Sequence, residues 1–358
     1  MPPIKLAILV LLSAIYLFSS ASAFACGREQ TQWLKHDGKM RSYRIYKPCT
    51  WQREKPALLI FHPSQSSGKG MSDTLNAPVV GIGMNELART KGFMVIYPDG
   101  LNNRGYNLGA RVWNDGRGFI GEQSGINDND DLGFINALLN HITNTEKANP
   151  KKIYATGLAM GGAFSYSLLC HMSERFAGIA SVASHLSERV MRSCPMNNKK
   201  LKLLMINGSW DTAAPYCAPH ESLSPLLPDL CRDVTNYDQI FEKPNQADLT
   251  VTTGEMLSAF STQTLFLRRK NCVLDSQSPV IDSISSPNDL TAFKEFNYHC
   301  AQGGPDSAKV VAIFGGGHVW PGGKEASGRL KDYFIWLVGP VSHEFNGSEY
   351  IWNYFTDN

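Results

Sequence analysis

Apolar residues in this chain gather in short continuous runs. The clearest two are residues 57–62 (Ala-Leu-Leu-Ile-Phe-His) and 93–98 (Phe-Met-Val-Ile-Tyr-Pro). A continuous run of this length that ends in a polar turn is typical of a strand buried on both faces. Residues 41–48 alternate instead between apolar and polar side chains, which predicts a half-buried strand. Further short strands are expected at 153–157, 178–183, 202–207 and 309–314.

Segments with helical spacing separate several of these runs. Apolar positions recur at helical spacing over 131–143, and helices are also expected at 85–91, 161–173 and 254–267. The acidic stretch 127–131 resembles a calcium loop in composition but lacks its glycine and distal glutamate, so we interpret it as a helix cap. Strands that alternate with helices indicate a mostly parallel sheet covered on both faces. The predicted fold class is therefore α/β, with the carboxyl ends of the parallel strands at one edge.

Composition and the lack of an evident linker favour one folded domain. The chain has 358 residues, 43% of them hydrophobic and 18% charged, and no repeat or linker divides it. Residues 24–358 are expected to form a single α/β domain. One stretch, about 217–253, is rich in Pro, Asp, Asn and Ser, and predicts a long loop insertion that could cover the active face as a lid. The net charge of +2, without a dense Lys/Arg run, gives no reason to expect nucleic acid as a partner.

The first 23 residues have the pattern of a signal peptide. Lys5 precedes an apolar core at 6–18, and Ala21-Ser22-Ala23 offers a cleavage site between small residues. The apolar core is shorter than the roughly 20 residues that span a bilayer. A retained anchor and a lipoprotein modified at Cys26 are the alternatives. We interpret the segment as a cleaved leader, which predicts a secreted or periplasmic protein without stable membrane insertion.

Cysteine usage agrees with export. An even number of cysteines in an exported chain favours disulfides. No CxxC or HxxxH pair offers zinc spacing, so neither a metal site nor a cofactor is expected. The sequence does not fix the connectivity, and pairing of neighbours (26–49, 170–194, 217–231 and 272–300) is the simplest arrangement. The eight cysteines are Cys26, Cys49, Cys170, Cys194, Cys217, Cys231, Cys272 and Cys300.

One glycine-flanked turn carries candidate chemistry. The segment Gly157-Leu-Ala-Met-Gly161 joins a predicted strand to a predicted helix. Glycines two positions before and after the central residue let strand and helix approach closely while that residue points out of a strained turn. This is the frame of the nucleophile elbow, G-x-S-x-G, with Ala159 in the place of the serine. With 31 glycines in the chain, the spacing alone also fits an ordinary tight turn.

Two further strand ends favour the catalytic interpretation. Asp211 lies in the turn after strand 202–207, and His318 follows strand 309–314 and three glycines. A histidine in such a place can polarise a nucleophile, and an aspartate can orient its imidazole. The chain order of nucleophile position, acid and base is the order found in α/β-hydrolases. We therefore expect Ala159, Asp211 and His318 to meet at one edge of the sheet.

Short blocks spread along the chain match one known pattern. They are YPDG (97–100), WND (113–115), DDLGFI (130–135), YATGLAMGG (154–162), FAGIASVAS (176–184), NGSWDTAAPY (207–216), GGGHVWPGG (315–323) and IWNYF (351–355). In these blocks the chain resembles the secreted esterase family of polyhydroxybutyrate depolymerases and feruloyl and acetylxylan esterases. The resemblance covers nearly the whole chain after the leader, except 217–253. It implies the α/β-hydrolase fold and carboxylic ester hydrolysis.

The resemblance also assigns roles. It implies Asp211 and His318 as acid and base, and the backbone N–H groups of Ser64 and Met160 as the oxyanion hole. It suggests the disulfides 170–194 and 272–300. Trp113 and Trp320 are candidates for the lining of a substrate groove, with packing in the core as the alternative. The implied partner is an ester-containing small molecule, a polyester, or a feruloylated or acetylated polysaccharide.

The chain departs from the family at the chemistry itself. Ala159 stands where the family has serine, and Ser165 and Ser167 lie in the following helix, where they cannot replace it. Loss of the hydroxyl removes the acyl-enzyme route. In addition, Pro63 follows His62 where the family usually has glycine, which fixes φ near −65° but leaves the Ser64 N–H intact.

Three hypotheses follow from these departures. The chain descends from an ester hydrolase and has weak or lost activity; it is a non-catalytic secreted binding protein that keeps a pocket for an ester, aryl or sugar ligand; or alanine was introduced to silence an active esterase.

Overall fold

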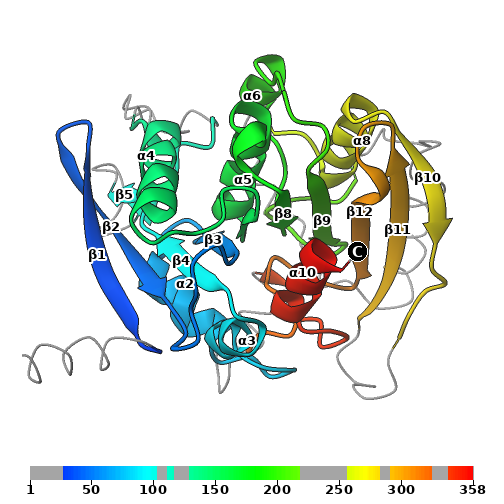
Figure 1. Ribbon diagram of the computed structural model, residues 1–358. Helices are drawn as coiled ribbons and strands as arrows, with labels where there is room; N and C mark the ends of the chain where they lie inside the picture. The colour runs from blue at the N-terminus through cyan, green and yellow to red at the C-terminus, as the bar shows by residue number, and fades with distance from the viewer. Residues whose placement is uncertain are drawn as a thin grey trace, which may run out of the picture.

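A ten-stranded sheet organises the residues that the structure describes (Figure 1). The computed structural model describes residues 27–102, 111–116, 129–217, 256–282, 291–324 and 338–357. The predicted leader (1–23) and nearly all of the predicted insertion (217–253) lie outside these ranges. The strand order in the sheet is β1-β2-β4-β3-β7-β8-β9-β12-β11-β10, and β5 and β6 form a separate pair.

The centre of the sheet is parallel and its two margins are antiparallel. Strands β4, β3, β7, β8, β9 and β12 pair in parallel. Strands β1 and β2 at one margin, and β10 and β11 at the other, pair antiparallel. This arrangement is the predicted α/β-hydrolase fold. The bounds are β1 Glu29–His36, β2 Lys39–Tyr46, β3 Ala57–Phe61, β4 Met94–Pro98, β5 Leu101–Asn102, β6 Arg111–Val112, β7 Ile153–Gly157, β8 Gly178–Val182, β9 Lys202–Gly208, β10 Cys272–Gln277, β11 Ala292–Cys300 and β12 Gly304–Phe314.

Helices cover both faces of the sheet, as the continuous apolar strands predict (Figure 1). In β3, Leu59 and Phe61 belong to the core under α4, α5 and α8, whereas Leu58 and Ile60 belong to the core under α2, α3 and α10. Successive side chains of a strand point to opposite faces, so a strand buried on both sides is apolar throughout. The helices are α2 Gly68–Leu75, α3 Met84–Lys91, α4 Asp131–Asn144, α5 Met160–His171, α6 Glu188–Arg192, α8 Ala259–Arg269 and α10 Gly347–Thr356.

Most predicted elements are present, with shifted ends. The helix expected at 254–267 begins only at Ala259, because the Ser258 side chain accepts the Ser261 N–H and caps it there. The sequence patterns missed several elements altogether, namely β1, β5, β6, β10, β11, α2, α6 and α10. Strand β1 (Glu-Gln-Thr-Gln-Trp-Leu-Lys-His) lies at the sheet margin, where side chains need not be apolar, so its sequence carries little signal.

Two predicted disulfides are confirmed. Cys170–Cys194 joins the end of α5 to the segment after α6, and Cys272–Cys300 joins directly opposed residues of β10 and β11. Cys49 and Cys217 are also disulfide-bonded. Their predicted partners, Cys26 and Cys231, lie outside the described residues.

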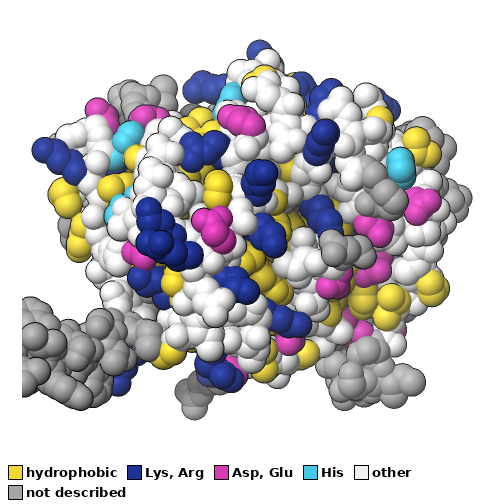
Figure 2. Space-filling model, in the orientation of Figure 1, with side chains coloured by type: hydrophobic (Ala, Val, Ile, Leu, Met, Phe, Trp, Pro, Cys, Tyr) yellow, Lys and Arg dark blue, Asp and Glu magenta, His cyan; other side chains and the backbone are white. Residues whose placement is uncertain are grey.

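The described surface is mixed in character. Figure 2 shows Lys and Arg side chains spread over the face seen there, with Asp and Glu among them. Trp33 and Met40 on the β1–β2 ribbon are 59% and 54% exposed.

A hollow of about 390 Å³ opens between the start of α4, α5 and α6. Among the described helices, none combines the length and apolarity needed to cross a membrane.

Candidate active site

The turn between β7 and α5 has the geometry that the glycine spacing predicts. Ala159 lies at its apex with φ 54° and ψ −117°. A Cβ atom on Gly157 would lie 2.3 Å from the carbonyl carbon of Gly161, and one on Gly161 would lie 2.2 Å from the Phe61 carbonyl oxygen. Only glycine fits at both positions, so the strand and the helix meet more closely than any side chain would allow.

The conformation of Ala159 is strained. A residue with a Cβ atom at this φ costs about 1–3 kcal/mol, and such residues persist where their surroundings hold them. The Ala159 N–H donates to the Val182 carbonyl over 3.0 Å, and its own carbonyl accepts the Ala163 N–H at 2.9 Å. Ala159 is 8% exposed. The turn therefore holds Ala159 at its apex in a strained conformation that the surrounding backbone maintains.

Asp211 and His318 form a hydrogen-bonded pair. The His318 Nδ1 atom lies 2.9 Å from Oδ1 and 2.8 Å from Oδ2 of Asp211. The Asp211 side chain is fully buried, and its Oδ1 also accepts the N–H groups of Ala213 and Ala214 at 2.9 and 2.7 Å. With Asp211 ionised, the His318 Nδ1–H is the donor. The tautomer thus leaves Nε2 as the ring atom that can accept a proton.

The loops that carry this pair are fastened to one another. The Trp210 N–H donates to the Gly316 carbonyl over 2.8 Å, and the His318 N–H donates to the Val338 carbonyl over 2.5 Å. A Cβ atom on Gly208 would lie 2.1 Å from the Gly316 carbonyl oxygen. The glycines before His318 let these backbones touch, and the contact fixes the imidazole relative to the carboxylate.

Parallel pairing places the three predicted residues at one edge. Strands β7, β8, β9 and β12 are parallel neighbours, and Ala159, Asp211 and His318 each follow a carboxyl end. In open α/β sheets, sites form at this edge. The structure joins Asp211 to His318 directly and places Ala159 at the same edge.

The predicted oxyanion groups lie on two segments that meet near the elbow, since a Cβ atom on Gly161 would lie 2.8 Å from the His62 carbonyl oxygen. Ser64 is exposed in the loop after β3, and Met160 is the first residue of α5. The first N–H groups of a helix have no acceptor within the helix and are free to bind an anion. Met160 is in such a position at the start of α5, whereas Ser64 lies in a loop.

His62 at the start of the Ser64 loop is a neutral, buried imidazole. Its Nε2 accepts the Gly100 N–H at 3.0 Å, so Nδ1 carries the proton and donates to the Pro63 carbonyl over 2.7 Å. Burial lowers the pKa of His62 from its usual 6.5 to about 4. The ring thus links the backbone at Pro63 to the backbone at Gly100.

We expect His62 to make stability depend on pH. Since its pKa is lower in the folded state, the unfolded chain binds the proton first, and stability is lost as pH falls from about 6.5 to about 4. The loss is about 3 kcal/mol. Denaturant unfolding of His62→Gln at pH 7.0, 5.5 and 4.5 should show a weaker pH dependence than the unsubstituted chain. His299→Gln, at an exposed position, is the matched control, and equal slopes for all three proteins would contradict the assignment.

Both candidate groove tryptophans are buried. Trp113 is 2% exposed and stacks on Phe164 with ring centroids 4.9 Å apart. Its Nε1–H donates to the His62 carbonyl over 3.2 Å, which places the ring beneath the Ser64 loop. Trp320 is 4% exposed and belongs to the core under α10. These positions fit the packing alternative for both residues.

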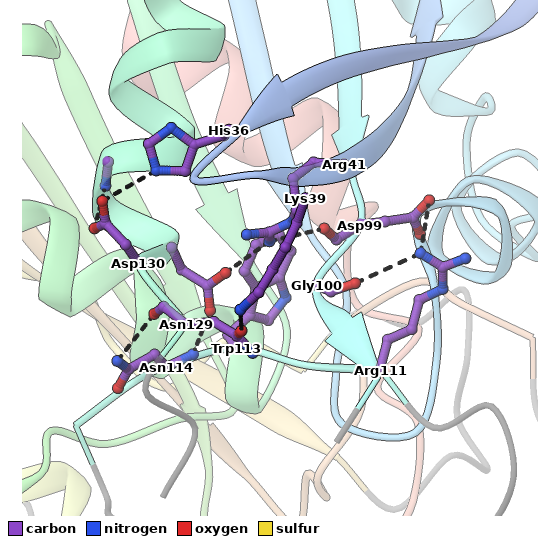
Figure 3. A network of polar contacts seen from close by, with 12 residues as sticks. His36, Lys39, Arg41, Asp99, Gly100, Arg111, Trp113, Asn114, Asn129 and Asp130 are labelled. Carbon is purple, nitrogen blue, oxygen red and sulfur yellow. Dashed lines mark hydrogen bonds and ion pairs between the residues drawn. The ribbon is translucent and has the colours of Figure 1, made fainter. Parts of the chain in front are cut away.

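A buried polar network that the sequence patterns missed supports the site (Figure 3). Arg41 on β2 donates to Asp131 Oδ1 over 2.6 Å, and their side chains are 1% and 0% exposed. Asp131 Oδ2 accepts the Asn114 N–H at 2.7 Å, and Arg41 also donates to the Asp99 carbonyl over 3.2 Å. Burial raises the pKa of Asp131, although Arg41 opposes that rise. Asp131 in the block 130–135 is thus the buried partner of Arg41, and Asp99 and Asn114 contribute backbone groups to the same network.

The acidic stretch before α4 is a helix cap, as predicted. The Asp130 side chain accepts the Gly133 N–H at 2.8 Å and the helix begins at Asp131. Asp130 also pairs with His36 over 3.0 Å. Within the described ranges, no three His, Cys, Asp or Glu side chains gather in a way that would hold a metal ion.

Comparison with known proteins points to esterases. No family model matches the chain. NocK of Nocardia uniformis subsp. tsuyamanensis, provisionally named an esterase, is 24% identical over 294 residues, 80% of this chain and 72% of NocK. Feruloyl esterase D of Neurospora crassa is 25% identical over 189 residues, 49% of this chain and 59% of that protein.

Solved structures give a distant likeness. An acetyl xylan esterase from Aspergillus awamori aligns with a TM-score of 0.42 at 12% identity, over 79% of this chain and 92% of that one. The strand order is that of the α/β-hydrolase fold, and the chain is similar in sequence to these esterases.

Proposed function

We propose that the chain is built as an exported serine-type carboxylic ester hydrolase in which Ala159 occupies the nucleophile position, and that hydrolysis by the chain as written is weak or absent. The observation that carries the proposal is the strained conformation of Ala159 between closely packed glycines. An ordinary turn between a strand and a helix does not require this strain. The Asp211–His318 pair at the same edge supplies the matching base.

Each residue has a defined part in the chemistry. A hydroxyl at position 159 would attack the ester carbonyl as His318 Nε2 takes its proton, and Asp211 would hold the imidazole and stabilise its charge. The N–H groups of Ser64 and Met160 would bind the oxyanion of the tetrahedral intermediate. With a methyl group at 159 there is no proton to remove and no acyl-enzyme to form. What remains is about 10³–10⁴-fold over water, from the oxyanion hole and binding.

The substrate class rests on the relatives. Their names include a feruloyl esterase, so we propose an ester-containing small molecule, a polyester, or a feruloylated or acetylated polysaccharide as the ligand. Disulfides persist in oxidising compartments, which supports a secreted or periplasmic location.

A second candidate is a non-catalytic binding protein. The presence of alanine at the apex of an otherwise complete elbow favours it, since the edge of the sheet still offers donors to an ester carbonyl. Calorimetric titration with ethyl ferulate and with an acetylated xylo-oligosaccharide separates the two proposals. A binding protein holds a ligand without turnover whether residue 159 is alanine or serine, whereas a silenced esterase turns the ester over once the serine is present.

We expect the chain as written to give no acyl-enzyme burst. Mixing it with p-nitrophenyl acetate in a stopped-flow instrument should release p-nitrophenolate only at a slow, linear rate, because no hydroxyl is available for acylation. His318→Ala provides the background rate for the same fold. A burst equal to the protein concentration would contradict the assignment of Ala159 to the nucleophile position.

A further inference from the structure

The loop that carries Ser64 is fastened along its whole length by one neighbouring turn and one short strand. At its start, His62 Nε2 accepts the Gly100 N–H at 3.0 Å. In its middle, the Gln65 N–H donates to the Arg111 carbonyl over 3.2 Å, and at its end the Gly68 N–H donates to Asp99 Oδ1 over 2.8 Å. All of these contacts lead to the Asp99–Gly100 turn after β4 and to Arg111 on β6.

Asp99 is itself held as a buried acceptor. Its Oδ2 accepts the Ser42 hydroxyl at 2.6 Å and lies 3.3 Å from an Arg111 Nη1 atom, and the side chain is 9% exposed. The Asp99 N–H donates to the Ser42 carbonyl over 3.0 Å. An ionised carboxylate accepts at both oxygens, so one side chain satisfies a hydroxyl, a guanidinium and a backbone N–H together. Figure 3 shows Arg111 reaching Asp99 and the Gly100 carbonyl from β6.

The backbone of the Ser64 loop (residues 62–68) is restricted at Pro63 and strained at Gln65, so contacts from outside the loop are needed to hold it in this conformation. Pro63 fixes φ on one side of Ser64, and Gln65 on the other side has φ 60°. A Cβ atom on Gly68 would lie 2.4 Å from the Tyr97 carbonyl oxygen, so the loop ends flat against β4. An oxyanion donor stabilises the transition state only when it lies about 2.7–3.1 Å from the developing charge. The position of the Ser64 N–H therefore has to be held closely.

We propose that Asp99 is a positioning residue for the Ser64 loop: through Gly68 and Arg111, its carboxylate sets where the Ser64 N–H points. The inference rests on the proposed function, since it assumes that the Ser64 N–H is an oxyanion donor. Asp99 does not touch the reacting atoms. It acts on the rate through the loop, and the Asp99–Gly100 turn couples the loop to the buried Arg41–Asp131 pair by way of the Asp99 carbonyl.

Asp99→Asn tests the proposal, because an asparagine keeps the shape but presents an amide donor to one of the three groups that donate to Asp99. In the Ala159→Ser background, we expect kcat for p-nitrophenyl butyrate to fall by about 10²-fold, the cost of misplacing a reacting group by about 1 Å. KM should change little, because an interaction made only in the transition state leaves ground-state binding intact.

Glu29→Gln in the same background is the matched control. Glu29 is another largely buried carboxylate at the sheet margin; it pairs with Arg44 over 2.7 Å, accepts from Asn85 at 2.7 Å, and also accepts from Ser72 and Asn76 at the far end of α2. Its described hydrogen-bond partners all lie outside residues 62–68. It reports the effect of losing a buried carboxylate in general. A fall in kcat confined to Asp99→Asn, at a comparable melting temperature, supports a positioning role. Equal falls in both variants, or no fall in Asp99→Asn, would overturn it.

A second measurement does not depend on catalysis. Amide hydrogen exchange of the chain with Ala159 in place should speed up at residues 64–68 in Asp99→Asn and stay unchanged in α4 and in Glu29→Gln. If Ala159→Ser proves inactive, the proposed hydrolase fails, and exchange alone decides whether Asp99 fixes the loop. Unchanged exchange at residues 64–68 would refute the positioning role whatever the activity.

Discussion

Ala159→Ser is expected to raise kcat for p-nitrophenyl acetate and butyrate by a factor on the order of 10⁵–10⁶, the size of the loss when the nucleophile of a serine hydrolase is removed. The strained backbone at 159 already exists, so a serine there is presented at the apex without rearrangement. The His318 tautomer leaves Nε2 ready to accept the hydroxyl proton. Steady-state hydrolysis by the two proteins side by side, with active-site titration of the variant, measures the gain.

Two further variants make this result specific. Ala159→Ser with His318→Ala should return to the background rate, because the hydroxyl then has no base. Ala159→Gly relieves the strain at φ 54° without adding a nucleophile, so it should be at least as stable as the unsubstituted chain and equally inactive.

Failure of Ala159→Ser to turn over either ester would end the hydrolase proposal and direct the search to a bound ligand. Full recovery means that alanine alone silences the enzyme, either by descent or by deliberate substitution. A small recovery means that other parts, with Pro63 as the first candidate, have diverged.

Arg41→Met is expected to have the largest effect on stability, a loss of about 3–5 kcal/mol. The substitution leaves the Asp131 carboxylate in the core with the Asn114 N–H as a remaining donor. A buried charge without its partner costs far more than a surface charge does. Chemical denaturation monitored by tryptophan fluorescence gives the free energy of unfolding, since Trp113 lies in the same core.

The loss caused by Arg41→Met should shrink as pH falls. Burial already raises the pKa of Asp131 with Arg41 in place, and removal of the guanidinium raises it further. A carboxyl whose folded pKa is raised stabilises the fold below its unfolded pKa, near 3.9, and loses that contribution as pH rises through the folded value. The difference between variant and parent should therefore be smaller near pH 4 than at pH 7.

Two controls separate charge from packing. Arg41→Met with Asp131→Leu removes both charges and should recover most of the lost stability, because an apolar pair of similar volume replaces a buried ion pair at little cost. Lys69→Met breaks an exposed pair with Asp73 and should change stability little. A loss for Arg41→Met that is independent of pH and is not recovered in the double variant would mean that the long side chain is needed for its packing on Phe134.

Local sequence patterns determined the central sheet and the turn at Ala159. The continuous apolar run at 57–62 predicts a strand with both faces buried, and β3 does contribute side chains to both cores. The glycines at 157 and 161 predict a tight strand-to-helix turn, because steric exclusion at a glycine acts within a few residues of the chain. Parallel pairing then requires that residues after the carboxyl ends share one edge, which is why Asp211 and His318 could be predicted as a pair.

Only the tertiary structure decided which polar groups are buried together. Arg41 on β2 is far in the sequence from Asp99, Asn114 and Asp131, which lie in or next to loops, where polar residues are common and carry no periodic signal. The sequence alone did not show whether Trp113 lies in a groove or in the core. In the structure it packs on Phe164 of α5. Strand β1 and helix α10 were not predicted for a related reason. Their stability comes from long-range contacts more than from local sequence patterns, and in α10 one such contact is Trp352 stacked on Phe93. The sequence by itself thus predicted which polar residues follow the strands at one edge of the sheet, while the fold decided which charged side chains are buried together.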